Sequence, residues 1–106
     1  MNMQKIIPLV IFFFTSLGVN AANFIVEQKD KAFSKSTLSV KVGDKIEFKN
    51  MDPYNHNIFS LSDIQLFDLG SYPKGESRTV TFEKPGTVDI ECAIHPAMKL
   101  TVDVSQ

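Results

Sequence analysis

The chain has 106 residues, of which 43% are hydrophobic and 22% are charged, and its formal net charge at pH 7 is −1. This length suits one compact domain. The weak charge argues against a protein that binds nucleic acid or an anionic membrane surface by electrostatic attraction. The sequence contains a single cysteine, Cys92, so no disulfide within the chain can stabilise the fold.

The first 21 residues are predicted to be a cleaved secretory signal peptide. Lys5 gives a positive start, residues 6–19 are almost all apolar, and Val19-Asn20-Ala21 offers the small residues that a signal peptidase accepts. A membrane anchor is the alternative, but a spanning helix needs roughly 20 apolar residues. We expect cleavage after Ala21, or else after Ala22. The mature domain over residues 22–106 is then expected in the periplasm, without stable insertion in the membrane.

Hydrophobic and polar residues alternate through most of the mature chain, which is typical of half-buried strands. Turn residues such as Gly43-Asp44 and Pro85-Gly86 separate these segments. Residues 61–75 are the least regular and are expected to form a loop or a short helix. The pattern predicts an all-β fold, a β-sandwich with Greek-key connections. Its strands are expected at 24–26, 38–42, 46–48, 80–82, 88–90 and 100–104.

Chemically active side chains gather near the end of the chain. The segment 92–98 (CAIHPAM) follows one predicted strand and precedes the next, and it carries Cys92, His95 and Met98. His56, the other histidine, lies 36 residues before the cysteine. A thiolate and two imidazoles, with a weak axial thioether, are the ligands of a blue-copper electron-transfer site. The spacing therefore predicts one copper ion bound by these four residues.

Other interpretations of these residues fit less well. Taken singly, Cys92 and Met98 are more often buried hydrophobic residues, and His56 is more often a surface or turn histidine. A structural zinc site does not use a thioether. A cysteine protease needs a histidine placed against the thiol and oriented by a third group, and His95 on the same short loop is badly placed for this. Taken together, the residues favour copper.

The mature chain resembles the cupredoxin family, and within it the amicyanin, pseudoazurin and plastocyanin proteins. The similar segments are residues 38–50 (LSVKVGDKIEFKN), His56-Asn57, residues 82–87 (FEKPGT) and the short C-x2-H-P-x-M loop. The resemblance implies that His56, Cys92, His95 and Met98 bind a type 1 copper. It also implies that Asn57 braces the ligand loop through its backbone N–H and its side chain.

The resemblance further implies a monomer that meets redox protein partners near the His95 ring, within an apolar patch. Residues 92–98 contain no charged side chain, which agrees with such a patch.

Two positions differ from the residues found in many relatives. Glu91 replaces an aromatic residue or a histidine, and Ile94 replaces a proline. Because Ile94 has a backbone N–H, we expect it to donate a second hydrogen bond to the Cys92 sulfur.

Two functions of different classes follow from the same ligands. The first is a periplasmic carrier of single electrons between redox partners, without enzymatic activity. The alternative is a copper carrier or tolerance protein that holds copper and hands it over. A third interpretation is a module that docks on an oxidase or reductase as one subunit.

Overall fold

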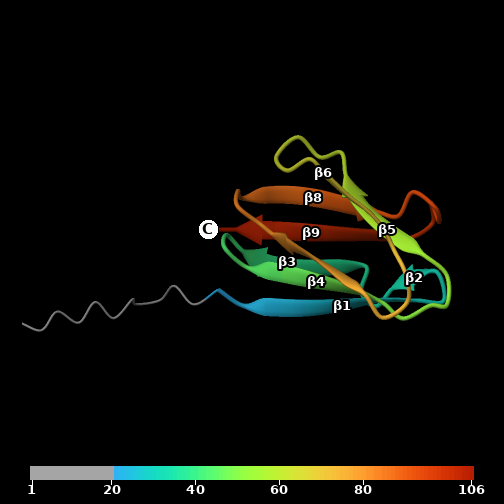
Figure 1. Ribbon diagram of the computed structural model, residues 1–106. Helices are drawn as coiled ribbons and strands as arrows, with labels where there is room; N and C mark the ends of the chain where they lie inside the picture. The colour runs from blue at the N-terminus through green and yellow to red at the C-terminus, as the bar shows by residue number, and fades with distance from the viewer. Residues whose placement is uncertain (1–20) are drawn as a thin grey trace, which may run out of the picture.

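The computed structural model describes residues 21–106, which form nine strands in two facing sheets (Figure 1). The four-stranded sheet has the order β2-β1-β4-β7, made by β2 (Ala32–Phe33), β1 (Asn23–Lys29), β4 (Lys45–Asn50) and β7 (Ser77–Thr81). The five-stranded sheet has the order β3-β9-β8-β5-β6, made by β3 (Thr37–Lys41), β9 (Lys99–Ser105), β8 (Gly86–Glu91), β5 (His56–Ser60) and β6 (Phe67–Tyr72). Within residues 21–106 no helix is long and apolar enough to cross a membrane.

Alternating side chains hold the two sheets together. In β4, for example, Ile46 and Phe48 are fully buried, whereas Lys45 points to solvent between its buried neighbours. The inward residues of both sheets form one core: Val26, Val40, Ile46, Phe48, Ile58, Tyr72, Val80, Phe82, Val88, Ile90, Leu100, Val102 and Val104. The predicted all-β sandwich is confirmed, and most of its core comes from the residues whose period of two identified the strands; Ile58 and Tyr72 come from strands outside the predicted set.

The order of the strands brings distant segments to one end of the sandwich. β1 and β4 are parallel, as are β3 and β9, whereas β8 is antiparallel to both β5 and β9. The loop after β8, the segment before β5 and the β1–β2 hairpin therefore lie at the same end. In Figure 1 this end is opposite to the C-terminus. The predicted ligand positions, on that loop and at the start of β5, thus share one end of the fold.

The expectation of a loop or short helix over residues 61–75 is wrong in part, because β6 occupies Phe67–Tyr72. The pairing of β5 with β6 shifts register between Asn57 and Phe59, and Gly70 adopts a φ of 74°. An extra residue at such a bulge reverses the order of inward and outward side chains. Because of this bulge, the residues of β6 do not alternate regularly between buried and exposed, and the strand is not apparent from the sequence pattern.

Gly86, the first residue of β8, is predicted to be strained by any added side chain. Its φ of 138° lies in a region that is nearly restricted to glycine, and an added Cβ would lie 2.7 Å from Ile64 Cδ1. Gly75 also has a positive φ, of 87°, but open space surrounds it.

We expect Gly86→Ala to lower the free energy of unfolding by about 3 kcal/mol and Gly75→Ala by about 1 kcal/mol. Urea denaturation of the metal-free proteins measures both values. Adding Ile64→Val, which removes the Cδ1 atom, is expected to restore part of the loss at Gly86 only. Equal losses in the two alanine variants would contradict the predicted clash.

Candidate metal centre

The segment after β8 forms two consecutive tight turns. The backbone N–H of His95 donates to the carbonyl of Cys92 at 3.2 Å, and the N–H of Met98 donates to the carbonyl of His95 at 2.9 Å. Each turn advances the chain by three residues, so the three donor side chains repeat at the same spacing. Cys92 and Met98 are buried, each with 1% exposure, whereas His95 is half-buried.

His56 is the first residue of β5 and is fully buried. Its Nε2 lies 2.7 Å from Oδ2 of Asp52, a carboxylate that is itself buried. A carboxylate at this distance holds the imidazole proton on Nε2, so the lone pair of the ring is on Nδ1. Nδ1 is the atom that faces Cys92 and His95.

Three donor atoms converge at this end of the sandwich. Cys92 Sγ lies 3.8 Å from His56 Nδ1 and 3.9 Å from His95 Nδ1, and the two nitrogen atoms are 3.2 Å apart. The point equidistant from the corners of a triangle with these sides lies about 2.1 Å from each. Metal–nitrogen and metal–sulfur bonds to a zinc-sized ion are about 2.0–2.3 Å long. These three atoms would therefore suit the binding of one transition-metal ion.

The kinds of donor select the metal. Sulfur and two imidazoles in a plane, with a thioether beside them, match type 1 copper and no common zinc site. Met98 provides the thioether as a buried side chain in the turn that follows His95. Together with the cluster of His56, Cys92 and His95, it gives an arrangement like that of type 1 copper sites.

Asn57 makes both contacts that the family resemblance implies. Its backbone N–H lies 3.5 Å from Cys92 Sγ, and its side-chain Oδ1 accepts a hydrogen bond of 2.7 Å from the N–H of Ala93. β5 is thereby connected directly to the loop after β8. The second backbone donor expected for the sulfur is absent, because among residues 21–106 only Asn57 donates a backbone N–H to Sγ. Ile94 lies at the outer corner of the turn from Cys92 to His95, with 49% of its surface exposed.

Asp52 is a site residue that the sequence analysis missed. Besides contacting His56, its carboxylate accepts the backbone N–H groups of Asp30 at 2.8 Å and Lys31 at 3.2 Å. Burial opposes its ionisation, but the hydrogen bonds from His56 and these two N–H groups outweigh burial and lower the pKa to about 2. The carboxylate therefore stays charged at any physiological pH and orients the imidazole of His56.

Tyr54 is a second residue that the sequence analysis missed. Its ring centroid lies 5.4 Å from that of His56 and 5.4 Å from that of His95, and 36% of its surface is exposed. Tyr54 thus covers both imidazoles on their solvent side.

The pKa of His95 is lowered by burial and then by the neighbouring His56 and Lys31. Its imidazole is therefore held in the neutral form that binds metals.

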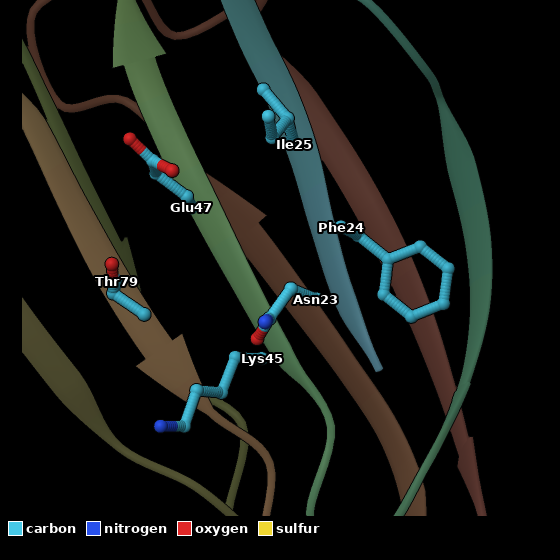
Figure 2. Close-up of a pocket in the computed structure, with 6 residues that line it drawn as sticks. All are labelled: Asn23, Phe24, Ile25, Lys45, Glu47 and Thr79. Carbon is cyan, nitrogen blue, oxygen red and sulfur yellow. The ribbon is translucent and has the colours of Figure 1, made fainter. Parts of the chain in front are cut away.

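A shallow pocket of about 380 Å³ lies elsewhere, on the outer face of β1, β4 and β7 (Figure 2). Its lining consists of Asn23, Phe24, Ile25, Lys45, Glu47 and Thr79. None of these residues offers a thiolate, an imidazole or a thioether, so the pocket is unrelated to the metal centre.

The charge on Asp52 is predicted to make the metal-free protein more stable as the pH rises above its pKa. The folded pKa of about 2 lies below the ordinary value of 3.8, so this stabilisation is present above pH 3.8 and is lost as the pH falls through 2. Asp52→Asn removes the charge. We therefore expect the variant to be less stable than the wild type at pH 6, with the difference shrinking toward pH 2.

Urea denaturation at several pH values measures this difference. Asp63→Asn, at an exposed carboxylate, is the control and should leave the pH profile unchanged. A difference between Asp52→Asn and the wild type that does not vary with pH would contradict a charged Asp52.

Comparisons with known proteins agree with this site. A family model described as copper-binding proteins of the plastocyanin/azurin family matches residues 20–105. The chain is 32% identical over 69 residues to the methylamine utilization protein MauL of Methylorubrum extorquens, a match that covers 64% of this chain. That match spans 60% of the relative's own length.

Solved structures show the same architecture. A reduced Cu(I) form of an amicyanin variant superposes with a TM-score of 0.72 at 25% identity, covering 89% of this chain and 90% of the amicyanin. The purple cupredoxin of Nitrosopumilus maritimus gives a TM-score of 0.69 at 26% identity, covering 77% of this chain and 99% of the other. A copper nitrite reductase of Thermus scotoductus matches with a TM-score of 0.72 at 26% identity, but only over 22% of its own chain and 78% of this one. The family match, the sandwich and the convergent donors lead to one conclusion: the chain belongs to the plastocyanin/azurin family of copper-binding proteins, the cupredoxins.

Proposed function

We propose that this protein carries single electrons between redox proteins through one type 1 copper held by His56, Cys92, His95 and Met98. The observation that supports this proposal most directly is the triangle of donor atoms, which already has the size of a trigonal metal site. Bound copper supplies a one-electron couple between its Cu(I) and Cu(II) states. The four side chains set its geometry.

The residues around the donors favour transfer of an electron over rearrangement. His56 is fixed by Asp52, and the Cys92 sulfur receives the N–H of Asn57. Both ligands are buried in a packed sandwich, where side chains have little room to move. A site that changes little between two oxidation states exchanges electrons with a small reorganisation. This rigidity supports an electron carrier over a protein that releases its copper, and it supports a role without enzymatic activity.

We propose a location in the periplasm, reached through the signal peptide predicted for residues 1–21 and followed by the domain at 22–106. The boundaries rest on the sequence, and residues 1–20 lie outside the described part of the chain. The buried Cys92 is compatible with an oxidising compartment, because a metal-bound, inaccessible thiolate does not form adventitious disulfides.

The proposed partner surface surrounds His95. Ala93, Ile94, Pro96 and Ala97 are all exposed and apolar, and the exposed Tyr54 adjoins them through its contact with the His95 ring. An apolar surface around a ligand imidazole allows a redox partner to approach the metal closely and to separate again quickly. The protein is proposed to act here as a monomer that meets its donor and its acceptor in turn.

Addition of Cu(II) to the mature protein is predicted to give an intense thiolate-to-copper band in the visible spectrum and a reversible voltammetric wave. Cys92→Ser is expected to abolish the band. Met98→Leu should keep the band but shift the potential, and Met51→Leu, outside the donor set, should change neither. A strong visible band in Cys92→Ser would contradict the ligand assignment. Rapid loss of Cu(I) to a chelator, without a reversible wave, would instead favour a copper carrier.

The proposed partner surface is tested with a matched pair of isoleucines. Ile94 is 49% exposed beside His95, whereas Ile25 is 61% exposed on β1 in the other sheet. We expect Ile94→Lys to lower the bimolecular rate of electron exchange with a redox protein about tenfold, because it desolvates a charge in the contact. The potential should stay nearly constant, and Ile25→Lys should leave the rate unchanged. Equal rates in the two variants would exclude this surface.

A further inference from the structure

The opposite end of the sandwich contains a carboxylate that binds the first residue before β1. Oδ1 of Asp44 accepts the backbone N–H of Ala22 at 2.8 Å, and Oδ2 accepts the backbone N–H of Lys41 at 2.8 Å. The carbonyl of Ala22 in turn accepts the N–H of Lys45 at 3.0 Å. Both backbone groups of Ala22 are thus bound before the chain enters β1.

The hydrogen bonds to the carboxylate of Asp44 come from backbone N–H groups. Asp44 is 6% exposed, and among residues 21–106 its carboxylate takes part in no salt bridge. The N–H groups of Ala22 and Lys41 lower its pKa, so it is charged at neutral pH. The ammonium group of Lys41 contributes only a weaker Coulombic attraction. A charged carboxylate whose hydrogen bonds come from backbone N–H groups still lacks a compensating positive charge in direct contact.

We propose that Asp44 is the binding site for the new N-terminus of the processed protein, the α-ammonium group of Ala22. Hydrolysis of the Ala21–Ala22 peptide bond by one water molecule, catalysed by a signal peptidase, leaves a carboxylate on Ala21 and an amine on Ala22. The amine is protonated at neutral pH. The N–H that donates to Asp44 thereby becomes part of an ammonium group, and a hydrogen bond becomes an ion pair.

The geometry selects Ala22 over Asn23 as the first residue. Asn23 is paired with Lys45 in the parallel register of β1 and β4, and Figure 2 shows the two side chains next to each other. A chain that begins at Asn23 lacks the N–H donated to Asp44 and the carbonyl bound by Lys45.

This inference rests on the proposed export of the chain, and a first experiment separates the two. The full chain is expressed in a bacterium, and the intact mass of the protein released from the periplasm is measured. We expect the mass of a chain that begins at Ala22. A periplasmic chain that begins at Asn23 or later would overturn the inference and leave export intact, whereas an unprocessed chain would overturn both. Neither result bears on copper binding.

A second experiment tests the ion pair itself. The processed protein is compared with its N-terminally acetylated form, in the wild type and in Asp44→Asn. Acetylation is expected to lower the melting temperature of the wild type by roughly 2–5 °C, as loss of a weak ion pair does in a small domain. It should have no effect in Asp44→Asn. Asp68→Asn is the matched control, because exposed Asp68 also accepts a backbone N–H, from Gly70.

The titration of the α-amino group distinguishes an ion pair from a merely structural role of Asp44. In the wild type its pKa is expected above the ordinary range of about 7.7–8.0, and in Asp44→Asn it should return to that range. The nearby ammonium groups of Lys41 and Lys45 lower the α-amino pKa in both proteins. Their effect therefore cancels when the wild type is compared with Asp44→Asn. An α-amino pKa that is the same in both proteins, or an equal effect of acetylation in both, would overturn the inference.

Discussion

The metal centre depends on one buried carboxylate, that of Asp52. It receives hydrogen bonds from His56 and from the backbone N–H groups of Asp30 and Lys31. Asp30 and Lys31 form the turn between β1 and β2, and their φ angles are positive, 55° and 60°. Non-glycine residues adopt such angles at a cost in conformational energy. Asp52 offsets this cost with two charge-assisted hydrogen bonds. The same carboxylate that stabilises the hairpin fixes the proton of His56, so the fold of β1–β2 and the position of the free lone pair on His56 are linked.

The sequence predicts the convergence of the donor residues well because their chemistry is rare and their spacing is short. Cys92, His95 and Met98 lie within seven consecutive residues, and the local turns alone set their relative positions. Asp52 and Tyr54 were harder to recognise. Acidic and aromatic residues are common in turns, so their presence between β4 and β5 does not by itself indicate a site. Their role appears only when β1, β4 and β5 meet in space. A carboxylate four residues before a ligand histidine was the one available signal.

The unpaired cysteine shows how the fold protects a reactive group. Cys92 is 1% exposed, and its sulfur is surrounded by His56, His95 and the N–H of Asn57. The side chain of Asn57 also holds Ala93, the residue after the thiol. The loop is therefore anchored to β5 at the first two residues of its first turn. Such anchoring keeps the sulfur in place independently of the exposed residues that follow, and it leaves those residues free to form a contact surface.

Two aspartates clamp the parallel pair of β1 and β4 at its two ends. Asp44 directly precedes β4 and binds Ala22 before β1, whereas Asp52 follows β4 and binds Asp30 after β1. Both bonds span 22 residues, the same offset as the register of the two strands. Parallel pairing is slightly weaker per residue than antiparallel pairing, and a slip by one residue would turn every side chain to the wrong face. Carboxylates at both ends oppose such a slip, because either shift breaks two charge-assisted bonds at once. The clamp at Asp52 thereby secures the register on which the position of His56 depends.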